Sequence, residues 1–131
     1  MNILKPTDIE EQIRTALAEY LNVYVRPLPE TYALPNIMAT VSGGSTTNTI
    51  DTFTVTLDAR AETDADALDY LNDALGVLAE QAAAQVGAIR NVSINSLASW
   101  GSDPVRPDLK LCTATVLITA HREGKTINKK T

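Results

Sequence analysis

The stretch from residue 48 to residue 86 constrains the fold most, because an alternating strand pattern passes almost directly into a long helical pattern. Over 49–60, apolar residues alternate with threonine and aspartate, which predicts a strand with one packed face and one polar face. Leucine and alanine then recur at helical spacing over 63–86, after a capping residue at Thr63, and Gly87 suits the end of this helix. The strand and the helix form one strand-helix unit.

The predicted helix is apolar over more than half of its circumference, whereas an ordinary surface helix carries a stripe of about 100°. Two neighbouring stripes run along it, formed by Leu68, Leu71, Leu75, Leu78 and Ala82 and by Ala67, Tyr70, Ala74 and Val77. A sheet on one side and a second helix on the other can cover this surface within the chain. A neighbouring subunit is the alternative, so Tyr70 and Val77 are candidate contact residues between copies.

The remaining pattern predicts a helix from Thr7, where Thr7 and Glu10 form a capping box and Glu10 faces solvent. Further strands are predicted over 22–26, 37–41, 89–100 and 109–121, and weak alternation near Leu97 predicts a bulge. The order α-β-β-β-α-β-β indicates an α+β fold. We expect a mainly antiparallel sheet of about four to five strands, with two helices packed on one face.

Composition narrows the class of protein. The 131 residues suit one domain, which we place over 1–122, followed by a flexible basic tail over 123–131. Hydrophobic residues make up 44 % of the chain, which argues against global disorder, and the net charge of −5 argues against a general nucleic-acid binder. We find no secretion signal, and no apolar run approaches the roughly 18 residues of a membrane span.

The sequence gives only weak support for a metal site, a nucleophile-base pair or a phosphate-binding loop. Carboxylates crowd residues 62–73, but their spacing departs from a calcium loop and is typical of a solvated helix face. Cys112 and His121 are nine residues apart in one strand and therefore lie on opposite faces, so they cannot form a nucleophile-base pair. The glycine-rich segment 42–47 lacks the ending of a phosphate-binding loop. We predict no catalytic, cofactor-binding or metal-binding residues and no enzyme activity.

Two loops are candidate contact sites instead. Gly43 and Gly44 lie at a predicted flexible hairpin tip, and such tips often touch partners. The loop 101–108 carries Arg106 and follows Trp100, the single tryptophan. Trp100 suits either a core plug or an interface anchor, and both interpretations stay open.

The sequence resembles tail terminator (tail completion) proteins of long-tailed, siphovirus-type bacteriophages. The residues that carry the resemblance are Thr-Val-Thr-Leu-Asp-Ala-Arg-Ala-Glu-Thr over 54–63, then Ala-Asp-Ala-Leu over 65–68 and the long alanine- and leucine-rich helix. The similarity extends over roughly 7–122 in the order and spacing of elements.

The resemblance implies a structural virion protein that forms a ring, typically a hexamer, at the end of the tail tube. Its partners would be further copies, the tail-tube protein and a neck or head-completion protein. DNA would pass through the lumen without specific binding, and no membrane or cofactor would be involved. The protein would assemble in the host cytoplasm and remain in the virion. A neck protein, a tail-tube-like protein and a small ligand-binding or regulatory α+β module remain as alternatives.

Overall fold

A computed structural model describes residues 1–47 and 50–130. Residues 48 and 49, where the predicted turn ends and the predicted strand begins, and Thr131 lie outside the described residues. The elements along the chain are β1 (Asn2–Lys5), α1 (Ile9–Leu17), β2 (Val23–Tyr24), β3 (Asn36–Thr47), β4 (Ile50–Ala61), α2 (Asp64–Ala83), β5 (Ile89–Ser102), β6 (Lys110–His121) and β7 (Glu123–Thr126). The predicted α+β class is confirmed.

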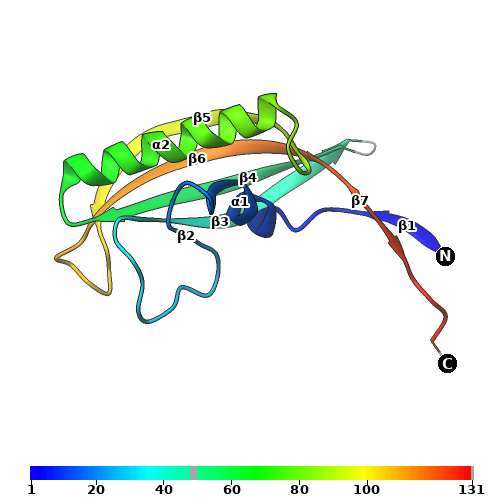
Figure 1. The fold of residues 1–131 in the computed structure, drawn as a ribbon, viewed down its shortest axis with the longest axis horizontal. Coiled ribbons are helices and arrows are strands. Elements are labelled where there is room, and N and C mark those ends of the chain that lie inside the picture. Colours follow the sequence, from blue (N-terminus) through cyan, green and yellow to red (C-terminus); the bar gives the residue numbers. More distant parts are fainter. Residues whose placement is uncertain (48–49, 131) are drawn as a thin grey trace.

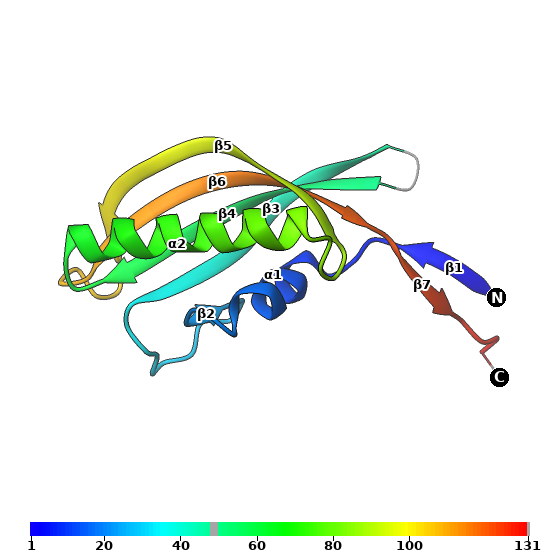
Figure 2. The ribbon, with the colours of Figure 1, turned by 45° about the horizontal axis from the view of Figure 1, so that its top comes forward.

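The main sheet has five strands in the order β2-β3-β4-β6-β5. The short β2 runs parallel to β3, and the other neighbours are antiparallel. α2 lies along β4, β5 and β6, while α1 packs on α2 and β3 (Figure 1). Figure 2 shows both helices on the same side of the curved sheet, as the sequence pattern predicts.

The core lies between this sheet face and α2, and it is built mostly of small aliphatic residues. Alternate residues of β4 and β6 point into it, which follows from the two-residue period of a strand. Its fully buried members include Val55, Leu57, Ala59, Cys112, Ala114, Val116, Ile118, Ala67, Leu71, Ala74 and Leu78. The opposite sheet face carries half-buried threonines, with Thr56 between Thr40 and Thr115 in the ladder.

α2 begins as predicted, because the Thr63 hydroxyl accepts a hydrogen bond from the backbone N–H of Asp66 at 3.2 Å. The helix ends at Ala83, earlier than the predicted Val86, and Gln85 and Gly87 both have positive φ angles. The predicted irregularity near Leu97 is also present, since the register of β5 against β6 shifts between Ser96 and Ser99.

The start of α1 differs from the prediction. Asp8 caps the helix by accepting from the N–H of Glu11, whereas the Thr7 hydroxyl donates to the Glu123 carboxylate. Glu10 is buried rather than solvent-facing, because its carboxylate accepts hydrogen bonds from Arg26 and from the N–H of Val41. The capping-box pattern correctly predicts a helix start in this region, but it places the N-cap at Thr7, one residue before the observed N-cap Asp8.

The glycine-rich segment is also a correction. Residues 42–45 belong to β3, so Gly43 and Gly44 do not form a hairpin tip. The strand bulges between Val41 and Gly43, and Gly43 has a φ of +153°, which favours glycine. A Cβ on Gly44 would lie 2.5 Å from the carbonyl oxygen of Thr52. The glycines therefore serve a bulge and a close backbone approach.

The predicted flexible tail is replaced over 123–126 by β7, which pairs antiparallel with β1. The two strands form a ribbon that we call the terminal arm, residues 1–5 and 123–130. Both views show it projecting from one end of the main sheet, away from α2 (Figures 1 and 2). Sequence analysis missed this pairing because each partner is only four residues long.

Candidate functional site

The six predicted contact residues fall in four separate regions of the fold and do not converge on one site. Gly43 and Gly44 lie in β3, Tyr70 and Val77 in α2, and Trp100 near the end of β5. Arg106 lies in the loop between β5 and β6. This distribution is not that of a catalytic constellation, in which side chains approach a common point.

Tyr70 has a structural role within the chain. It packs against the core, and its hydroxyl oxygen lies 2.5 Å from the backbone nitrogen of Asn22, which donates to it. This bond fixes the segment after α1 against α2. Val77 also packs partly against the core, but one side of it borders an open groove.

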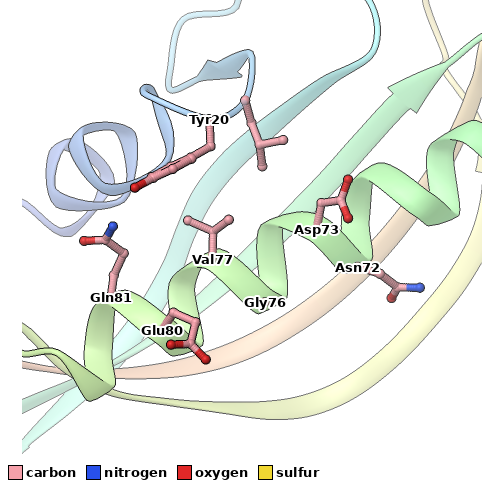
Figure 3. A pocket seen from close by; sticks show the side chains of 8 residues that line it. Tyr20, Asn72, Asp73, Gly76, Val77, Glu80 and Gln81 are labelled. Atoms are coloured by element: carbon pink, nitrogen blue, oxygen red, sulfur yellow. The ribbon is translucent and has the colours of Figure 1, made fainter.

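The groove runs between the end of α1 and the outer side of α2. It has a volume of about 560 Å³ and is lined by Tyr20, Leu21, Asn72, Asp73, Gly76, Val77, Glu80 and Gln81. Figure 3 shows Val77 pointing from α2 towards Tyr20, with Gly76 presenting bare backbone beside it. We refer to this feature as the α2 groove.

The charge around the α2 groove is negative. α2 contains five carboxylates and no lysine or arginine, and its acidic members are Asp64, Asp66, Asp69, Asp73 and Glu80. All five are exposed, and none of them forms an ion pair within the described part of the chain. The groove therefore combines an apolar wall with an acidic border.

The loop after β5 is fixed by a buried ion pair. Arg60 Nε donates to Asp103 Oδ2 at 2.6 Å, and the other carboxylate oxygen accepts from the N–H groups of Val105 and Arg106. Burial raises the pKa of Asp103, but these hydrogen bonds outweigh burial and hold its pKa below the ordinary range. Arg106 is exposed and pairs with Asp108. The loop thus has a base fixed by a buried ion pair and an exposed Arg106–Asp108 pair at its tip.

Trp100 lies on the outer strand of the sheet. Its side chain is 52 % exposed, so the interpretation as a core plug is wrong. Ile94 and Leu97 on the same strand are also exposed. No strand in the described part of the chain pairs with the outer side of β5, so three large apolar residues accompany an unpaired sheet edge.

The terminal arm is the contact element that sequence analysis missed. Arg122 anchors its base by hydrogen bonds to the buried Asp51 carboxylate and to the Thr46 hydroxyl. The hydrogen bonds that Arg122 donates to the Asp51 carboxylate are the main cause that holds the pKa of Asp51 below its ordinary value. Beyond the base, Met1, Leu4 and Ile127 are exposed. Apolar residues at both chain ends could have indicated this element in the sequence, but each segment is too short to show the alternation of a strand.

The described residues contain no group of three His, Cys, Asp or Glu side chains that could hold a metal ion. Cys112 is fully buried, and burial raises the pKa of its thiol, so it is not an activated nucleophile. Neither helix in the described ranges is both long and apolar enough to cross a membrane.

Comparison of the chain with protein-family models and with curated proteins finds no match.

Proposed function

We propose that the protein is a structural component that assembles into a ring of identical copies. Its role would resemble that of a phage tail terminator, which caps the tail tube and joins it to the head. The observation that carries the proposal is the number of separate contact-type surfaces on so small a domain. The α2 groove, the terminal arm and the outer edge of β5 each present apolar side chains to solvent.

Assembly is favoured by the nature of these surfaces. An unpaired edge strand is a template for pairing with another chain, and native proteins usually shorten, charge or cover such an edge. β5 is instead 14 residues long, with bulges in its register as its main protection. Because the surfaces differ from one another, contacts between copies would join unlike patches, and such contacts close into rings when the rotation permits.

A structural role also agrees with the distribution of charged groups. The buried ionisable side chains Glu10, Asp51, Arg60 and Asp103 are all engaged in pairs within the chain. Their task is to fix α1, the arm and the loop after β5, not to meet a substrate. The acidic body would suit a channel wall that DNA passes without binding.

Electron microscopy with tail tubes tests the proposal. The tubes would be formed by the major tail protein encoded beside this chain, and the terminator role predicts that its gene lies just before that of the tail protein. We expect one ring of the protein at one end of each tube. Decoration of the tube wall would favour a tube-like role, and attachment only to head portals would favour a neck role. A monomer that binds neither would refute the structural role.

A further inference from the structure

The terminal arm is too small to be stable without support. An isolated two-stranded ribbon is marginal in water, because neither of its faces is covered. Each strand of the arm has four residues, and β1 and β7 pack on each other with at most marginal contact to the helices and the main sheet. Leu4 is 58 % exposed in the middle of the ribbon. The arm is therefore an element that another surface should cover.

The α2 groove is a surface that something should fill. Gly76 lies in the middle of a 20-residue helix, where glycine is less favourable than alanine by roughly a factor of five in helix equilibrium. Apart from its chain neighbours and the nearby backbone of its own helix, a Cβ built on Gly76 would meet no atom of the described residues within 4 Å, so packing there does not require glycine. Bare backbone beside Val77 instead permits close approach by a second chain.

The charges of the two surfaces are complementary. The terminal arm carries Lys5, Lys125, Lys129 and Lys130 against Glu123, so residues 1–5 and 123–131 have a net side-chain charge of +3. The chain total of −5 then leaves a net charge of −8 on residues 6–122, and α2 alone holds five carboxylates without a basic residue. By contrast, the exposed edge of β5 carries Arg90 and no acidic residue.

We propose that the terminal arm of one copy docks in the α2 groove of the next copy. The exposed Leu4 would pack near Gly76 and Val77, while the arm lysines would face Asp73 and Glu80. This inference rests on the proposed self-assembly and names the contact that produces it. It is a head-to-tail contact, because the arm and the groove are different surfaces, and repetition of it generates a ring.

Directed disulfide formation tests the contact. Two full-length variants, Leu4→Cys and Val77→Cys, are mixed and oxidised, with a mass tag on one of them to identify the mixed product. The native Cys112 is fully buried and stays silent. We expect the mixed disulfide in at least tenfold excess over that formed by Leu4→Cys with the control Val105→Cys, although Val105 is the more exposed partner. Equal yields from the two pairs would overturn the inference.

A matched pair of leucine substitutions tests the groove by a second route. Gly76→Leu adds a side chain inside the groove, whereas Ala79→Leu adds the same side chain to an exposed position of α2 that does not line it. We expect both variants to fold, as measured by circular dichroism. Only Gly76→Leu should weaken self-association, by about tenfold or more.

Charge reversal completes the test. Lys125→Glu with Lys129→Glu should weaken assembly by about tenfold, as should Asp73→Lys with Glu80→Lys, and combining all four changes should restore it. If the wild type assembles and every one of these variants assembles equally well, the arm contact is refuted while the proposed function stands. A wild-type chain that stays monomeric, alone and with tail tubes, refutes both.

Discussion

Replacement of Asp103 by asparagine tests the ion pair that fixes the loop after β5. The Arg60 and Asp103 side chains are only 10 % and 4 % exposed, and one nitrogen of Arg60, Nη1, has no hydrogen-bond partner among the described residues. Removing one member of a buried pair leaves an uncompensated charge and costs about 3–5 kcal/mol. Asparagine keeps an oxygen that accepts from the N–H groups of Val105 and Arg106. We therefore expect the free energy of unfolding to fall by about 3 kcal/mol, the lower end of that range.

The assay is urea unfolding followed by circular dichroism at pH 7. With a urea dependence of about 2 kcal/mol per molar, the midpoint of Asp103→Asn should fall by about 1.5 M. Asp108→Asn is the control, because the Asp108 pair with Arg106 is exposed, and its midpoint should stay near that of the wild type.

Acid provides an independent check on the same variant. The pKa of Asp103 in the folded state lies below its ordinary value of 3.8, so the stabilisation is complete above that value. It is lost as the pH falls through the folded-state pKa, since protonation then removes the charge in both states. The difference between wild type and Asp103→Asn should therefore shrink in acid. A midpoint shift at pH 7 as small as that of the control, or a difference that grows in acid, would refute the reasoning.

Three further perturbations address the core and the other buried groups. Glu10→Gln should lower the free energy of unfolding at pH 7 by about 1–3 kcal/mol, because Arg26 and the N–H of Val41 lose a charged acceptor, and urea unfolding measures this loss. The loss should diminish below about pH 4.5, since burial raises the pKa of Glu10 but its hydrogen bonds lower the pKa more. Leu57→Ala should cost about 2–5 kcal/mol, because Leu57 is fully buried, and its thermal midpoint should fall accordingly. Cys112 should react with a thiol reagent only after denaturation, and rapid labelling of the native protein would contradict its burial.

The sequence pattern predicts the elements whose period is strong. The alternation over 49–60 and the helical spacing over 63–86 both correspond to observed elements, and the buried side of α2 combines members of both predicted stripes. The start of α2 was predictable from Thr63, because threonine is a preferred N-cap residue and its hydroxyl accepts a hydrogen bond from the backbone N–H of Asp66. The end of α2 was less predictable, since residues 84–86 continue the apolar pattern after the helix has ended.

Errors arose where a distant partner determines the local structure. Glu10 looks solvent-facing within its own helix, and only the approach of Arg26 and Val41 buries it. The strand β7 exists because β1 lies beside it, although more than 100 residues separate them in the chain. The candidate contact residues show the same limit. Tyr70 is tied to Asn22 by a hydrogen bond that its own helix does not reveal, and Gly76 carries no side chain that would indicate a contact.

The mass of the assembled protein in solution tests the central claim most directly. Light scattering on the full chain alone, over a wide range of concentrations, distinguishes a closed ring from other states, and a separate sample with tail tubes shows whether the protein stays unbound. The account predicts a single species at a fixed whole-number multiple of 14.1 kDa, which stops growing once the ring is complete. A mass of 14.1 kDa under all of these conditions, or a mass that increases without limit as concentration rises, would contradict it.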